Sequence, residues 1–285
     1  MVEVAWKERL DDLQIGSLAE MFGVEKPIIG MVHLWPLPGA PGYADYGVDT
    51  ILIHAREDAQ ALLEGGVNGL IVENMWDLPY YVNADVQIES VTAQAVAARK
   101  IKEMAGVPVG VNVIHNGWRA ELAIAIAAGL DFMRVCILTG ARLWDTGDLD
   151  AGCAADLLRR RKELGAERIR LLADVDKKHS VPFPGIDLET HIEWTEFYRP
   201  DALIVSGRMT GDAPDLDKVR RAKERASRPI LMGSGTTAKN IAAFLQYADG
   251  AIVGSSLKVD GVMENPVDPE RVRRYMEAVK EVRAG

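Results

Sequence analysis

Side chains suited to acid–base chemistry stand at the ends of short apolar runs in this sequence. His33 and Glu73 each end such a run, while Arg134 and Asp174 interrupt two later runs that are otherwise apolar. An ionised Arg or Asp in an apolar strand is costly unless it is paired. We therefore expect Arg134 to pair with Asp174 or with Glu73. Such a set could supply a general acid or base together with a cation for developing negative charge.

The candidate catalytic set includes three further polar residues. In the predicted reaction, Glu73 or Asp174 is the general acid or base, whereas Arg134, Asn112 and Lys178 stabilise negative charge. Lys178 keeps a Schiff-base mechanism open, although no lysine stands at a clearly inward strand position. The alternative is that the charges form a salt-bridge network without chemistry. The full candidate set is His33, Glu73, Asn112, Arg134, Asp174, Lys178 and His179.

Glycine–serine turns end the last two apolar runs and predict a phosphate site. Glycine allows the backbone to approach an anion closely, and N–H groups and serine hydroxyls can then cradle it. Ser206 and Gly207, which end an earlier apolar run, could contribute to the same phosphate site. The alternative is that these turns are structural and that Thr236 or Thr237 caps the next helix. The predicted phosphate-binding residues are Ser206, Gly207, Gly233, Ser234, Gly235, Gly254, Ser255 and Ser256.

The same region of the sequence could also hold a divalent metal ion. Nitrogen and oxygen ligands of the kind that zinc, manganese or magnesium use are present, but no closely spaced pair of ligands fixes a site. The sequence therefore leaves the metal and any other cofactor open. The candidate ligands are His33, Glu73, Asp174, Asp176 and His179.

The elements that must position these residues alternate strictly along the chain. Eight short apolar runs, each followed by an amphipathic segment, predict an α/β fold of the (β/α)8 TIM-barrel type, with a short extra helix at 18–22 before the first strand. An open doubly wound sheet is the alternative. In a TIM barrel the carboxyl ends of the strands carry the function, and the candidate residues fall at those ends. The predicted strands are 27–33, 69–73, 109–113, 132–137, 169–175, 202–206, 230–233 and 251–254; the predicted helices are 50–64, 86–104, 118–128, 151–164, 188–198, 215–226, 238–247 and 268–282.

Strand periodicity and loop composition give further expectations. Leu172, Asp174 and Asp176 should share the inner face of their strand, because side chains alternate with a period of two. The loop at 139–147 has a glycine near each end and is expected to be mobile. Two loops rich in aromatic residues could wall a substrate site, contact another subunit or simply cover apolar surface; they carry Trp35, Tyr43, Trp76, Tyr80 and Tyr81.

Length and charge limit the classes of function. The 285 residues are predicted to form one domain, with the barrel proper at about 27–285. A net charge of −9 and a pI near 5.2 disfavour a nucleic-acid-binding surface. We expect no membrane span, since no stretch of about 18 apolar residues occurs, and no signal peptide. Two cysteines cannot build a disulfide framework, so a cytoplasmic protein is expected.

Several motifs in the same order resemble the BtpA/SgcQ family over nearly the whole chain from about Pro27. They include the segments at 29–39, 71–74, 108–112, 132–140, 173–179, 201–207, 233–235 and 253–258. The resemblance implies a TIM-barrel enzyme, and the family takes its name from a member implicated in photosystem I biogenesis.

Two hypotheses about function follow from these residues and the resemblance. The first is an enzyme that acts on a small phosphorylated metabolite, a sugar or nucleoside phosphate, as an isomerase, a lyase or aldolase, or by cleaving a glycosidic bond. The second is a non-catalytic biogenesis or stability factor that binds a protein partner through Trp35, Trp76, Tyr80 and Tyr81. A homo-oligomer would be compatible with either.

Overall fold

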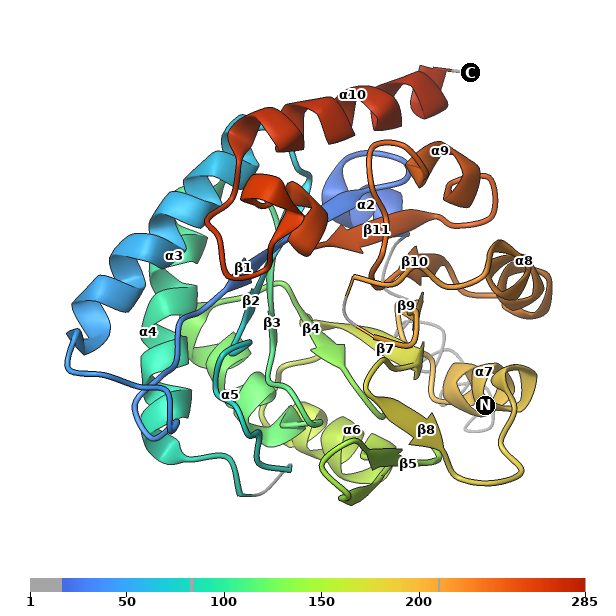
Figure 1. Ribbon diagram of the computed structural model, residues 1–285. Coiled ribbons are helices and arrows are strands. Elements are labelled where there is room, and N and C mark those ends of the chain that lie inside the picture. Colours follow the sequence, from blue (N-terminus) through green and yellow to red (C-terminus); the bar gives the residue numbers. More distant parts are fainter. Residues whose placement is uncertain (1–16, 83–84, 210, 285) are drawn as a thin grey trace, which may run out of the picture.

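Eight parallel strands close into a barrel in the computed structural model, which describes residues 17–82, 85–209 and 211–284 (Figure 1). The first strand pairs with both the second and the last, so the barrel has no free edge. The predicted TIM-barrel fold is therefore confirmed. The barrel strands are β1 (Ile28–His33), β2 (Gly69–Glu73), β3 (Val109–Asn112), β4 (Phe132–Val135), β7 (Arg170–Asp176), β9 (Ala202–Val205), β10 (Ile230–Met232) and β11 (Gly250–Val253).

Helices surround the barrel at the predicted places, with one large difference. The helix expected at 238–247 is only four residues long, and the residues before it form a loop. Neither threonine caps it, since the N-cap is Asn240, which makes no side-chain capping bond. Thr236 Oγ1 instead accepts a hydrogen bond from the Tyr275 hydroxyl (2.9 Å). The helices around the barrel are α3 (Gly47–Glu64), α4 (Ile88–Ala105), α5 (Trp118–Ala128), α6 (Ala154–Glu163), α7 (Leu188–Phe197), α8 (Leu216–Arg225), α9 (Ile241–Phe244) and α10 (Pro269–Ala284).

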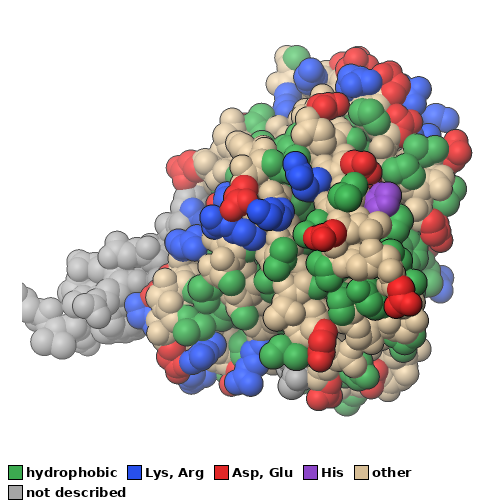
Figure 2. Space-filling view, turned by 90° about the vertical axis from the view of Figure 1, so that its left-hand side faces the viewer, with side chains coloured by type: hydrophobic (Ala, Val, Ile, Leu, Met, Phe, Trp, Pro, Cys, Tyr) green, Lys and Arg blue, Asp and Glu red, His purple; other side chains and the backbone are tan. Residues whose placement is uncertain are grey.

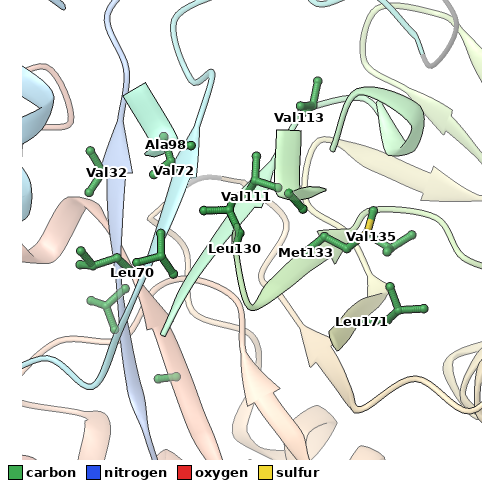
Figure 3. Close-up of a cluster of buried hydrophobic side chains, with 14 of the residues drawn as sticks. Val32, Leu70, Val72, Ala98, Val111, Val113, Leu130, Met133, Val135 and Leu171 are labelled. Carbon is green, nitrogen blue, oxygen red and sulfur yellow. The ribbon is translucent and has the colours of Figure 1, made fainter. Parts of the chain in front are cut away.

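Alternation along the strands divides the core into two apolar layers. Val32, Val72 and Val111 belong to the layer between strands and helices (Figure 3), whereas Ile71 and Phe132 belong to the cluster inside the barrel. Since side chains alternate with a period of two, the last inner position of each strand falls at the carboxyl end of the barrel. These positions are His33, Glu73, Asn112, Arg134 and Asp174 in the strands, and Ser206, Gly233 and Gly254 directly after β9, β10 and β11.

The predicted extra helix closes the opposite end of the barrel. This helix, α2 (Leu18–Phe22), begins at Ser17, whose hydroxyl accepts from the Glu20 amide in a capping box. Phe22 packs edge-on against Phe132 with the ring centroids 5.7 Å apart. Because the amino end is filled with apolar side chains, only the carboxyl end is left for polar chemistry.

A small antiparallel sheet replaces the mobile loop that we expected at 139–147. Its strands β5 (Ala141–Trp144), β6 (Leu149–Ala151) and β8 (Ser180–Pro182) pair in the order β6-β5-β8. Buried Arg142 ties this sheet to the loop after β7, since its Nη2 donates to the Lys177 carbonyl oxygen at 3.3 Å. The expected loop is thus partly strand, because backbone pairing with β6 and β8 orders residues 141–144.

The helix-covered face that carries α3 and α4 is mixed in character. Side chains of Lys and Arg lie scattered among those of Asp and Glu and among apolar ones (Figure 2). Within the described residues, the structure contains no helix with the length and apolar character needed to cross a membrane.

Candidate active site

An ion pair between Arg134 and Asp174 lies inside the carboxyl end of the barrel. Arg134 Nε and Nη2 donate to Asp174 Oδ2 and Oδ1, each at 2.9 Å, and both side chains are almost fully buried. Burial opposes the charge on each partner, but mutual attraction wins: the pKa of Arg134 is raised and that of Asp174 is lowered. Lys177 Nζ, 3.8 Å from Asp174 Oδ2, adds to the lowering. Asp174 is therefore an ionised carboxylate with little basicity.

His33 and Glu73 form a second buried pair beside it. His33 Nε2 lies 3.7 Å from Glu73 Oε1 on the neighbouring strand. Burial, with the nearby charges of Lys258, Lys178 and Arg134, lowers the pKa of His33 well below its usual range, so this imidazole is neutral. Gly254 makes room for the ring, since a Cβ at this position would lie 2.9 Å from His33 Cε1.

Lys178 lies beside these two pairs at the mouth of the barrel. Burial and the cations Arg134 and Lys177 lower its pKa to about 8, against the attraction of Glu73 and Asp174. In the described part of the chain, its amine has no hydrogen bond or ion pair within bonding distance. Lys178 therefore exchanges a proton near neutral pH without breaking a salt bridge.

A narrow cavity of about 20 Å³ lies where the two glycine–serine turns meet this charged cluster. It has room for one water-sized group. Six of the predicted phosphate residues line it, together with His33, Glu73, Arg134 and Lys178. The six are Gly233, Ser234, Gly235, Gly254, Ser255 and Ser256.

The other two predicted phosphate residues lie behind the turn that follows β10. Ser206 Oγ is 3.5 Å from Asp174 Oδ1, and the Gly207 amide donates to Ser234 Oγ at 3.3 Å. The Ser234 hydroxyl also donates to the Asp212 carbonyl oxygen (3.1 Å). Ser206 and Gly207 thus support the turn and do not line the cavity.

Several amides of the two turns lack an acceptor. Among the described residues, no oxygen accepts a hydrogen bond from the N–H of Ser234, Gly235, Thr236, Ser255 or Ser256. Ser234 and Thr236 are buried, and buried backbone N–H groups are nearly always paired with protein, water or ligand. The two turns therefore offer unpaired donors next to the cations Arg134 and Lys178, which favours an anion.

A cavity of about 660 Å³ adjoins the narrow one and shares Glu73 and Lys178 with it. Its wall is largely apolar and aromatic, and it comes from the loop after β2, from β5 and from the loop after β11. Sequence reasoning missed Trp144, Met263 and Glu264, which only the tertiary structure brings here. The wall-forming residues include Met75, Trp76, Leu78, Pro79, Tyr80, His115, Trp144 and Met263.

Three candidate residues, Asn112, His179 and Asp176, lie at positions that differ from the expected ones. Asn112 lines neither cavity; its amide donates to buried Glu121 (2.8 Å) and to the Arg134 carbonyl oxygen (2.9 Å). His179 lies at the rim of the large cavity, with Nδ1 3.1 Å from Asp145 Oδ2. Asp176 forms ion pairs with Lys218 and Arg142, because a register shift between Asp174 and Asp176 breaks the expected alternation.

The five candidate metal ligands do not form one cluster. Across the described ranges, no three His, Cys, Asp or Glu side chains are grouped so that they could hold a metal ion. His33 and Glu73 are neighbours, but Asp174 is bound by Arg134, and Asp176 and His179 have partners of their own.

Comparison with known proteins identifies the family. The model of the BtpA family matches residues 24–281. This chain belongs to the BtpA family. A relative in Synechocystis sp., named photosystem I biogenesis protein BtpA, is 37% identical over 267 residues, which cover 93% of this chain and 92% of the relative.

Solved structures outside the family share the barrel. Tryptophan synthase from Mycobacterium tuberculosis superposes with a TM-score of 0.63 at 19% identity, covering 95% of this chain and 100% of that one. N-(5'-phosphoribosyl)anthranilate isomerase from Pyrococcus furiosus gives 0.55 at 14% identity, covering 90% and 99%. At these identities the likeness concerns the fold alone.

Proposed function

We propose that this BtpA-family protein is an enzyme that acts on a small phosphorylated metabolite by acid–base chemistry at the carboxyl end of the barrel. One observation carries the proposal: unpaired amides of two glycine–serine turns border the same narrow cavity as Glu73, Arg134 and Lys178. Anion donors and an acid–base pair in one recess are the parts that such a reaction needs.

The phosphoryl group would enter the narrow cavity with one oxygen and accept hydrogen bonds from the two turns. TIM barrels frequently bind phosphate in the loops after the last two strands, which here follow β10 and β11. The Pyrococcus furiosus isomerase, whose name includes a phosphoribosyl substrate, shares this barrel fold. The charge of Lys178 would complete the neutralisation of the anion.

Glu73 is our candidate for the acid–base group, in preference to Asp174. Both oxygens of Asp174 accept hydrogen bonds from Arg134, which makes this carboxylate a poor base. Within the described ranges, the ion-pair partner of the Glu73 carboxylate is the neutral His33 at 3.7 Å, and Glu73 lines both cavities. Glu73 would move the proton, Lys178 would stabilise the negative charge that develops, and Arg134 would orient Asp174 and strengthen the local positive field. Asn112 would position the strand that carries Arg134.

Titration calorimetry with inorganic phosphate tests the anion site. Ser255→Glu places a carboxylate in the narrow cavity and should weaken phosphate binding at least tenfold. The matched control is Thr92→Glu, which adds the same charge on an exposed position of α4. Equal phosphate affinity in the two variants would refute the anion site.

The catalytic part of the proposal is tested with a mixture of phosphorylated sugars and nucleotides, followed by mass spectrometry. Wild type should convert at least one component, and Glu73→Gln should fold normally but convert it at least a hundredfold more slowly. Full activity in Glu73→Gln would show that Glu73 is not the acid–base group. The reaction class among isomerase, lyase or aldolase, and glycosidic cleavage would follow from the product.

A non-catalytic biogenesis or stability factor is the second candidate, because the Synechocystis relative carries the name of a biogenesis protein. The aromatic residues that motivated a protein-binding surface are dispersed in the structure. Trp35 stacks on His54 at 3.9 Å, Trp76 and Tyr80 line the large cavity, and Tyr81 is exposed. If this candidate holds, Tyr81→Ala should abolish capture of a partner protein, whereas Glu73→Gln should leave it intact.

The predicted cytoplasmic location and homo-oligomer remain predictions. Light scattering coupled to gel filtration would give the number of subunits directly.

A further inference from the structure

We propose that the large cavity binds a planar heteroaromatic ring of nucleobase size, carried by the same substrate whose phosphoryl group occupies the narrow cavity. The inference rests on the proposed function for the phosphoryl end, and it narrows the substrate class from any sugar phosphate to a nucleotide-like molecule.

The first argument for a ring-binding site is the size and the lining of the large cavity. About 660 Å³ is well within the range of small-molecule sites, and it far exceeds what a phosphorylated sugar reaching from the narrow cavity would fill. The wall includes Met75, Trp76, Tyr80 and Met263, which present apolar and aromatic faces. A bare sugar would leave those faces against water, whereas a flat ring would cover them.

The aromatic wall is held in place before any ligand arrives. The Tyr80 hydroxyl donates to the Met75 carbonyl oxygen at 2.6 Å, and the Tyr80 ring lies 5.0 Å from that of His115. His115 in turn stacks on Trp144 at 4.2 Å and 16°. Burial lowers the pKa of His115 to about 4, so the stack carries no charge at neutral pH. A fixed wall loses little conformational entropy when a ring stacks on it.

Polar groups on the other side of the cavity favour a heteroaromatic ring over a plain hydrocarbon one. Asp145 and His179 are partly exposed at the rim, and Lys177 and Glu264 lie in the same lining. Carboxylate, imidazole and ammonium groups can hydrogen-bond the ring nitrogens and exocyclic groups of a nucleobase. Asp145 and His179 also pair with each other at 3.1 Å, and a phenyl ring would make no hydrogen bond to any of these groups.

The fourth argument is the position of the large cavity relative to the acid–base group. Glu73 and Lys178 are the residues common to both linings. A substrate with phosphate in one cavity and the ring in the other therefore places the atoms that join its two halves beside Glu73 and Lys178. This is where a reaction at the linkage between ring and sugar would occur.

Calorimetry with ribose 5-phosphate, adenosine 5'-monophosphate and uridine 5'-monophosphate tests the inference. At least one nucleotide should bind roughly 5- to 150-fold more tightly than ribose 5-phosphate, the gain that stacking of one base on an aromatic side chain provides. Trp76→Ala should remove most of that gain and leave ribose 5-phosphate binding unchanged. The matched control is Trp194→Ala, which removes a half-exposed tryptophan of α7 outside this cavity. Met263→Gln provides a second wall variant, should Trp76→Ala fail to fold.

The outcomes separate this inference from the proposed function. Nucleotides that bind no more tightly than ribose 5-phosphate would overturn the ring site and leave the phosphate site standing. If no phosphate compound binds, the nucleosides adenosine and uridine test the ring site alone: binding that Trp76→Ala abolishes supports it, and absence of binding overturns it.

Discussion

Removing one member of the Arg134–Asp174 pair should destabilise the protein severely. Asp174→Asn keeps the shape of the side chain and removes its charge. Arg134 then remains charged inside the barrel, because a guanidinium keeps its proton at neutral pH, although its side chain is only 2% exposed. Lys177 also loses the carboxylate 3.8 Å from its amine.

The expected cost follows from this burial. Leaving an uncompensated charge by removing one partner of a buried ion pair typically costs about 3–5 kcal/mol of unfolding free energy. A folded protein has only about 5–15 kcal/mol in total, so Asp174→Asn should lose a large share of it. Replacing both partners by apolar residues, as in Arg134→Met with Asp174→Leu, should cost much less, because no buried guanidinium is left behind.

Urea denaturation followed by circular dichroism measures these differences. The matched control is Asp217→Asn, which breaks the exposed pair with Arg220 on α8 and should cost less than about 1 kcal/mol. The reasoning is refuted if Asp174→Asn is no more destabilising than Asp217→Asn, or if the double variant is as unstable as the single one.

Three further predictions concern groups near the site. The affinity for phosphate, measured by calorimetry, should fall as the pH rises from 7 to 9, because Lys178 has a pKa of about 8 and loses its charge in this range. The Lys178→Met variant should bind phosphate more weakly than wild type, and its affinity should depend less on pH. Burial raises the pKa of Glu121 to about 8, so this carboxyl is protonated in the folded protein and loses its proton on unfolding between about pH 4.5 and pH 8. The stability that the protonated form contributes is therefore lost as the pH rises through this range. Glu121→Gln should flatten the dependence of the urea midpoint on pH in the same range. Gly235→Ala should lower the melting temperature more than Gly147→Ala. Both glycines have a positive φ, but at Gly235 the new Cβ would also collide with the backbone nitrogen of Ala213, whereas at Gly147 it would meet open space. Equal losses in melting temperature would contradict this reasoning.

Most of the fold was predictable because its signals are local. The eight apolar runs and their amphipathic partners can be recognised from sequence spacing, and the barrel strands lie within two residues of the predicted ends at most positions. The helix predicted at 238–247 is shorter than expected, since only Ile241–Phe244 is helical and no side chain caps its first turn. The small sheet at β5, β6 and β8 was missed because it joins segments from two different loops.

The inner layer at the carboxyl end could be predicted in the same way, up to a point. A period of two places His33, Glu73, Arg134 and Asp174 inside. Of the two partners expected for Arg134, Asp174 or Glu73, the structure shows Asp174. Asp176 was assigned to the same face, but the register shift after Asp174 turns it toward Lys218. A bulge of this kind depends on pairing with the neighbouring strand, and no pattern within β7 reveals it.

By itself, then, the sequence determined the order of elements, the closed barrel and the residue types that meet at its mouth, because hydrophobic periodicity and turn residues act over a few positions. The tertiary structure alone decided which charges neutralise each other and which remain available. Asp174 is bound by Arg134 while Glu73 and Lys178 border both cavities, and the aromatic wall combines Tyr80, His115 and Trp144 from three separate loops. Burial and long-range contact set these differences, since the free energy of a charge depends on the groups that surround it in space.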